Sequence, residues 1–220
     1  MEQMSLSLSG TGYSRVGDAI RERIISGQYQ PGVRLKINDL CTDFGISSNP
    51  VREALQQLQG EGLVVILPNK GAMVRSIDED LIRHIYDIGA GIDGILARRC
   101  AAMATTAQVE KLRQMQLQME RYDDLGDEVL RGRLNGEFHS ELGMISGNLE
   151  AWEIRKKHHI LIGVIRLKYG HAPGRFAEVK VEHWAIINAI ADGDPDAAEF
   201  AARHHCLRSC EDALAQFRSK

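Results

Sequence analysis

Apolar residues recur at helical spacing along most of the chain, and one short region breaks this pattern. This pattern predicts a first helix over residues 14–26. A second, shorter helix is predicted over residues 38–44. The β-branched run at residues 63–67, a turn at Pro68–Gly71 and a second extended run at residues 72–75 instead predict a β-hairpin.

The segment between the second helix and the hairpin predicts a tight turn and a further helix. Gly45 supplies the permissive backbone that commonly ends a helix. Asn49 is expected to cap the next helix, with Pro50 in its first position. The buried stripe of that helix falls at Val51, Leu55 and Leu58. A helix-turn-helix followed by a hairpin wing is typical of a winged-helix DNA-binding unit.

The exposed side of this unit has the chemistry that duplex DNA requires. Short polar groups stand at the start of the expected recognition helix, and Arg52 follows them, able to reach a phosphate or a guanine edge. A lysine stands in the turn of the wing. The expected DNA-binding residues are Arg34, Lys36, Asn38, Ser47, Ser48, Asn49, Arg52, Asn69, Lys70 and Gly71.

After Ser76 no strand-like alternation appears, and the pattern predicts helices up to the end of the chain. Each separator contains glycine, proline or a capping residue, which predicts an antiparallel bundle with short loops. The predicted helices cover roughly residues 78–104, 106–122, 127–146, 148–170, 174–192 and 195–217.

The predicted fold class is therefore mainly α, with an N-terminal winged helix-turn-helix followed by an all-α antiparallel bundle. The expected division is a disordered arm at residues 1–12, a DNA-binding domain at 13–76, and an effector-binding and dimerisation domain at 77–220. The 220 residues suffice for this arrangement.

Composition restricts the setting without revealing the function. The formal charge is −3, so DNA binding would depend on a local basic face and not on a basic protein. The four cysteines show neither a disulfide framework nor a zinc motif. No secretory signal or long apolar run appears, so we expect a cytoplasmic protein without membrane contact.

Three histidines of the expected bundle are placed to meet. His183 and His205 lie eleven residues before and after Asp194, the centre of the turn between the last two helices, so they reach the same height of an antiparallel pair. His139, one turn after Asn135, can complete a triangle. Neutral imidazoles converging in a bundle suit zinc or nickel. Taken singly, each histidine also fits an ordinary core or surface role.

The front part of the chain resembles the GntR family of bacterial transcription regulators. The resemblance runs through Pro50-Val51-Arg52-Glu53-Ala54-Leu55, Glu61-Gly62-Leu63 and Pro68-Asn69 with Gly71, and it covers nearly all of residues 13–76. It implies a dimeric regulator that reads double-stranded operator DNA. The chain departs from the family at Ser48, where an arginine is usual.

The rear part resembles the FCD effector domain of the FadR subfamily, through Asn135-Gly136-Glu137-Phe138-His139, Ser146-Gly147-Asn148, Glu182-His183, Gly193-Asp194 and His205. The resemblance implies a divalent metal held by one Asp and three His beside a pocket for a small carboxylic acid. Carried over, the ligands are Asn135, in place of the usual Asp, with His139, His183 and His205.

Two further departures concern the expected pocket. Gly89 stands where the family usually has an arginine, and Asp93 where it usually has glutamate. We expect Tyr86 and Arg166 to contact the effector, although Arg166 also fits a surface arginine whose stem lies on apolar residues.

The resulting hypothesis is a transcription regulator, of the repressor type, that forms a homodimer and is controlled by a small organic acid. Two alternatives use the same histidines: a metal-dependent hydrolase and a pure metal sensor. No carboxylate is expected beside the cluster as a general base, because Glu182 and Glu137 point away from the neighbouring histidines along their helices. This spacing argues against an enzyme.

Overall fold

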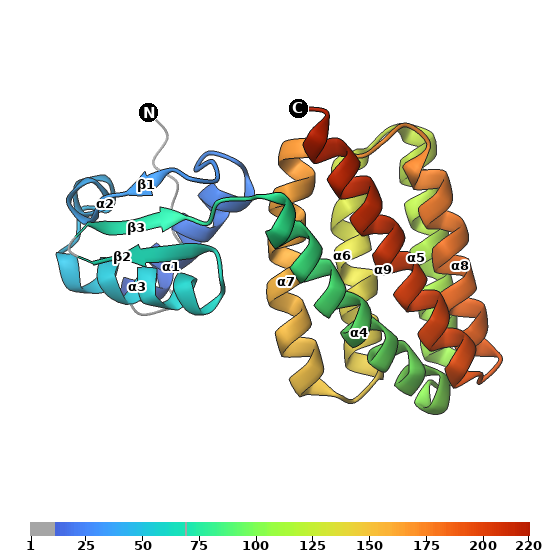
Figure 1. Cartoon of the computed structure of the whole chain (residues 1–220). Coiled ribbons are helices and arrows are strands. Elements are labelled where there is room, and N and C mark those ends of the chain that lie inside the picture. Colours follow the sequence, from blue (N-terminus) through green and yellow to red (C-terminus); the bar gives the residue numbers. More distant parts are fainter. Residues whose placement is uncertain (1–11, 69) are drawn as a thin grey trace. The chain divides into compact units, whose positions relative to one another are not determined.

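A computed structural model describes residues 12–68 and 70–220 (Figure 1). The described residues divide into two compact units. The first runs up to Ile77 and includes Ile160–Lys168, and the second consists of Asp78–His159 and Tyr169–Lys220. The predicted arm at residues 1–12 lies outside the described residues except for Gly12, which begins the first helix.

The first unit contains three helices, α1 (Gly12–Ile25), α2 (Ile37–Phe44) and α3 (Ser48–Gly60). Gly45 ends α2 in the left-handed conformation, as predicted. The start of α3 differs from the prediction, because Ser47 occupies the capping position and Asn49 and Pro50 lie inside the first turn. Proline is still tolerated there, since the first N–H groups of a helix have no partner within it. Arg21 of α1 holds Glu61 after α3 through two hydrogen bonds of 2.7 and 2.6 Å.

A small antiparallel sheet completes this unit, in the order β1 (Arg34–Leu35), β3 (Gly71–Val74), β2 (Val64–Leu67). The hairpin of β2 and β3 was predicted, but β1 was not, because two residues carry no detectable alternation. Gly71 is required at the contact between β1 and β3. A Cβ there would lie 2.4 Å from the backbone oxygen of Leu35, and its φ of +87° also favours glycine.

The second unit is a helical bundle, and all of its residues are described. Each helix of the bundle begins and ends within three residues of its predicted bounds. Side chains that cap the N-termini begin several of these helices where the sequence indicates. Asp78, Thr105, Asp127 and Asp194 each accept a hydrogen bond from a first-turn N–H. The helices are α4 (Glu79–Met103), α5 (Thr106–Leu125), α6 (Glu128–Ile145), α7 (Leu149–Tyr169, of which Ile160–Lys168 group with the first unit), α8 (Arg175–Ala191) and α9 (Pro195–Arg218).

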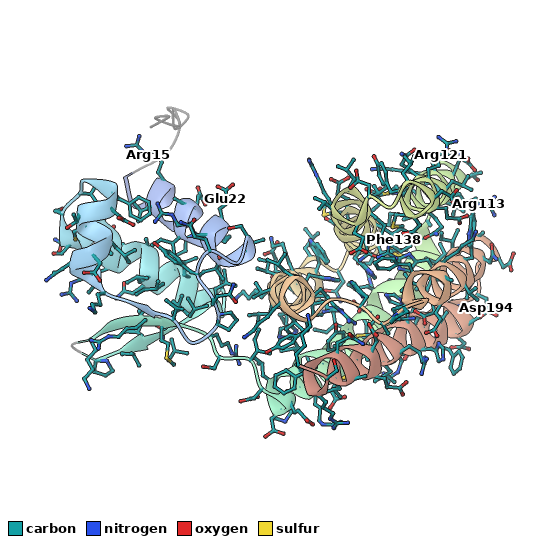
Figure 2. All side chains as sticks on the ribbon, turned by 90° about the horizontal axis from the view of Figure 1, so that it is seen from above. Arg15, Glu22, Arg113, Arg121, Phe138 and Asp194 are labelled. Carbon is teal, nitrogen blue, oxygen red and sulfur yellow. The ribbon has the colours of Figure 1, made fainter. Side chains whose placement is uncertain are left out.

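Within the bundle, α9 packs along α4 and α8, and α5 packs against α6 and α8 (Figure 1). Phe138 of α6 lies fully buried in the apolar core, whereas Arg113 and Arg121 of α5 point outward (Figure 2). Leu112, Met119 and Ile187 belong to the same core. Among the described residues, no helix is both long and apolar enough to cross a bilayer.

The contact between α6 and α7 depends on a glycine. A Cβ at Gly143 would lie 2.5 Å from Cδ2 of Trp152, so Gly143→Ala should lower the free energy of unfolding by about 1–3 kcal/mol. In the same helix a Cβ at Gly132 meets nothing within 4 Å. Gly132→Ala should therefore raise stability by up to about 1 kcal/mol through helix propensity. Thermal unfolding followed by circular dichroism compares them, and equal midpoints would contradict this packing.

Candidate DNA-binding face and histidine site

A groove of about 510 Å³ runs between the wing, the start of α2 and the exposed side of α3. Most of its polar lining consists of residues that the sequence predicted to meet DNA. The backbone oxygen of Lys70 accepts a hydrogen bond of 3.0 Å from Nε of Arg34, which ties the wing to β1. The predicted residues that line the groove are Arg34, Lys36, Asn38, Arg52, Lys70 and Gly71.

The start of α3 presents further predicted residues to solvent. Ser47, Ser48 and Asn49 are exposed at the N-terminus of the helix, where N–H groups and the helix dipole favour phosphate. Arg52, one turn further on, is exposed and forms no ion pair or hydrogen bond within the described residues. Its guanidinium is therefore available to a ligand. Asn69 lies outside the described residues.

In the second unit the structure brings together His139 of α6, His183 of α8 and His205 of α9. Their possible ligand atoms all lie within 4.8 Å of one another, and all three side chains are buried. The ring centroids of His183 and His205 are 4.7 Å apart, which agrees with the equal heights expected for an antiparallel pair. The distances from His139 to these rings are 5.5 and 5.3 Å.

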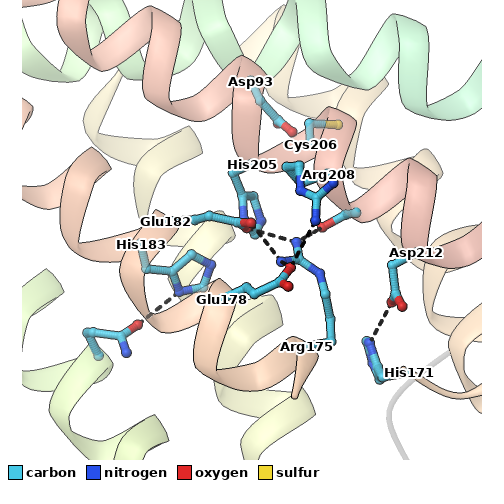
Figure 3. Close-up of polar contacts among 12 residues, drawn as sticks. Asp93, His171, Arg175, Glu178, Glu182, His183, His205, Cys206, Arg208 and Asp212 are labelled. Carbon is cyan, nitrogen blue, oxygen red and sulfur yellow. Dashed lines mark hydrogen bonds and ion pairs between the residues drawn. The ribbon is translucent and has the colours of Figure 1, made fainter. Parts of the chain in front are cut away.

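Hydrogen bonds from neighbouring side chains orient two of these rings (Figure 3). Nδ1 of His205 lies 2.7 Å from Oε2 of Glu182, and Arg175 holds both oxygens of that carboxylate at 2.6 and 2.8 Å. Nδ1 of His183 lies 2.9 Å from Oε1 of Gln116. With both Nδ1 atoms engaged in this way, both Nε2 atoms are left for another partner.

The protonation of the cluster suits a metal ion. Burial lowers the pKa of His139 to about 3 and lowers that of His183 well below its ordinary value, so both imidazoles are neutral, which is the ligating form. Nε2 of His183 is buried without a hydrogen-bond partner among the described residues. An orphaned nitrogen beside two other imidazoles fits a divalent ion bound by nitrogen donors.

Carboxylates stand closer to the histidines than the sequence predicted. The expectation that Glu182 points away holds for His183, but Glu182 contacts His205 on the next helix. Burial would raise the pKa of Glu182, yet its hydrogen bonds with His205 and Arg175 lower it to about 2. Its oxygens are committed to those two partners, so it orients the cluster and is not a free general base.

A second carboxylate, Asp93 of α4, lines a small cavity beside His139 and His205. The cavity measures about 10 Å³, which is room for a single ion or water. Asp93 forms a buried ion pair with Arg155 of α7 through two bonds of 2.7 Å. Burial would raise the pKa of Asp93, but the charge and hydrogen bonds of Arg155 lower it, so the carboxylate is ionised.

Arg155 and His159 were not predicted to belong to this site. Both lie on α7, four residues and thus one turn apart, which is the only signal that pairs them. The His159 ring centroid is 4.9 Å from that of His139, and its Nε2 is buried without a hydrogen-bond partner in the described part of the chain. Neither histidine spacing nor charge along α7 could show which face meets α4 and α6.

The remaining predicted residues divide between the two units. Tyr86 is buried in α4, and its backbone oxygen accepts a hydrogen bond of 3.5 Å from Cys206, which also contacts Arg155. Arg166 belongs to the segment Ile160–Lys168, which groups with the first unit, and it does not line the cavity. Asn135 lies half-buried one turn before His139, and its part in metal binding stays a prediction.

Comparison with known families covers most of the chain. Residues 12–74 match the bacterial regulatory proteins of the gntR family, and residues 84–208 match the FCD domain. The HTH-type transcriptional repressor RspR of Escherichia coli K12 is 27% identical over 208 residues, which are 91% of this chain and 88% of that protein. The gluconate operon transcriptional repressor of Bacillus subtilis is 29% identical over 198 residues, covering 86% and 79% of the two chains.

Solved structures share the fold. McbR/YncC of E. coli aligns with a TM-score of 0.77 at 17% identity, over 95% of this chain and 100% of that one. A GntR regulator from Rhodococcus sp. RHA1 aligns with a TM-score of 0.72 at 22% identity, over 92% and 97%. The winged helix, the helical bundle and both family matches lead to one conclusion: the chain belongs to the GntR family of bacterial regulatory proteins and is a DNA-binding transcription regulator, not an enzyme, that carries an FCD domain.

Proposed function

We propose that this protein is a repressor of the FadR subfamily whose affinity for operator DNA is controlled by a small organic acid bound beside a metal ion. The observation that carries the proposal is the buried triad of His139, His183 and His205 in the same chain as an exposed polar groove on a winged helix. In this proposal residues 13–76 bind DNA, and residues 77–220 bind the effector and dimerise.

Dimerisation would let two recognition helices read a pseudo-palindromic operator. The bundle offers an apolar surface for this purpose. Ile88 and Ile95 of α4 are both exposed, and their spacing of seven residues places them on the same helix face. Large aliphatic side chains on a single face favour a partner helix. The partner in the proposal is a second copy of this chain.

The metal would be zinc or nickel, held by the three histidines with Asn135 as the fourth candidate. Bound there, the ion would supply a positive charge to the carboxylate of an acid. Glu182 and Gln116 would keep the rings of His205 and His183 in the ligating orientation. Effector binding would control DNA affinity to the extent that the acid prefers one arrangement of the bundle, and coupling of about 1–3 kcal/mol is typical of such sites.

Pure metal sensing is a second candidate, and the size of the cavity favours it. About 10 Å³ accommodates an ion but no organic acid without rearrangement. The two candidates differ in what releases the operator. In a metal sensor, chelation by EDTA alone changes DNA affinity, whereas an acid-controlled regulator with its metal in place responds only when the acid is added.

The role of Arg52 is testable on an operator selected from random duplexes with the wild-type protein. Arg52→Ala should weaken binding by about 1–3 kcal/mol, because an exposed guanidinium contacting a base edge contributes that much. Arg121→Ala, an exposed arginine of α5, is the control and should bind as the wild type does. Gel-shift titration at fixed salt measures both. Unchanged affinity of Arg52→Ala would remove it from the interface.

The metal site is testable by elemental analysis. His183→Ala should abolish bound metal and the rise in the thermal midpoint that metal produces, because it deletes one of three converging nitrogens. His204→Ala is the matched control, since His204 is exposed and adjacent to His205. An identical ratio of metal to protein in wild type and His183→Ala would exclude the triad as the site.

A further inference from the structure

A buried arginine of α7 occupies the space that a side chain at position 89 of α4 would need. A Cβ built on Gly89 would lie 2.9 Å from Cζ of Arg155 and 3.1 Å from its Nη1. Arg155 is only 3% exposed, so its guanidinium lies within the bundle and not at its surface. The absence of a side chain at position 89 is therefore what allows an arginine from another helix to reach this point.

One nitrogen of the guanidinium lacks an acceptor. Nε and Nη2 each donate a hydrogen bond of 2.7 Å to Asp93, and Nη2 also lies 3.7 Å from Sγ of Cys206. Nη1 is buried and has no hydrogen-bond partner within residues 12–68 and 70–220. A buried donor on a charged group that lacks an acceptor is costly, so its presence points to an acceptor that the protein itself does not supply.

The ion pair connects this donor to the histidine cavity. Asp93 forms part of the cavity wall together with His139 and His205. The charge of Asp93 is already shared with Arg155, and the other polar groups of the cavity wall are imidazoles. A divalent ion among them would thus retain excess positive charge, which an incoming anion would balance.

We infer that Arg155 binds the carboxylate of the effector through Nη1, and that Gly89 is present to admit it. This inference rests on the proposed function and makes an arginine of α7 the positively charged side chain that binds the effector. The free nitrogen Nη1 can hold one carboxylate oxygen in a charge-assisted hydrogen bond, and the acid's other oxygen is left for the ion. Because the cavity is small, the ligand class is a carboxylate of few atoms, and binding must enlarge the cavity.

Acetate is the smallest probe of this chemistry, and acetamide is its uncharged counterpart. With the metal-loaded, full-length protein, acetate should raise the thermal midpoint in a saturable way, whereas acetamide should not. Removing only one partner of the ion pair would leave a buried charge, so one variant neutralises both partners and the other keeps both charges. Asp93→Asn/Arg155→Gln removes the pair of charges, whereas Arg155→Lys retains a cation opposite Asp93.

The Lys variant should retain the acetate response, and the Gln variant should lose about 10- to 100-fold in acetate affinity, which corresponds to one hydrogen bond to a charged group. Metal content, measured in each variant, should stay that of the wild type. Equal acetate affinity in the Lys and Gln variants, or no acetate response in the wild type, would overturn the inference. If operator and metal binding persist in either case, the proposed function survives without it.

Discussion

The cost of burying polar groups governs the second unit. Three imidazoles, three carboxylates and three guanidinium groups are buried between helices whose other facing residues are largely aliphatic. Removed from water, each must find a partner or lose stability. The pairs Arg155 with Asp93 and Arg175 with Glu182 meet this requirement through doubly hydrogen-bonded contacts. Nε2 of His183 and Nη1 of Arg155 are among the buried atoms that still lack a hydrogen-bond partner within the described residues, and the proposals above assign a ligand to each.

These two atoms without a partner differ in the kind of ligand they can bind. A neutral imidazole nitrogen offers a lone pair, which a metal ion takes, whereas a guanidinium N–H requires an acceptor, which an anion provides. His183 belongs to the triad and Arg155 pairs with Asp93, which lines one cavity together with two triad histidines, so the two atoms fit a ligand set composed of a cation and a small anion. The hydrogen bonds that Glu182 and Gln116 accept from Nδ1 of two of these imidazoles keep that arrangement in place before any ligand arrives.

The winged helix, unlike the bundle, does not bury the polar groups that are expected to bind its ligand. Its basic and polar groups remain in water, where they need no partner within the protein, and Arg52 illustrates this. Only the framework below is tightly constrained, as Gly71 against the backbone of Leu35 shows. Such a surface can exchange water and counterions for phosphates without disturbing the core, which is the usual source of affinity for duplex DNA.

The sequence by itself determined most of the fold. Capping residues and glycines fixed the helix ends, since these signals act within a few residues, and the family motif identified the DNA-binding unit. Equal distances from the turn at Asp194 were enough to predict that His183 and His205 meet, because an antiparallel helix pair converts sequence distance into height. Side-chain contacts between different helices were not predicted, and the reason is physical. Which side chain fills the space beside Gly89, and which carboxylate meets His205, depends on how α7 is rotated against α4 and how α8 is rotated against α9. Only tertiary packing fixes that rotation, so the contacts that Arg155, Glu182 and His159 make in this site became visible in three dimensions alone.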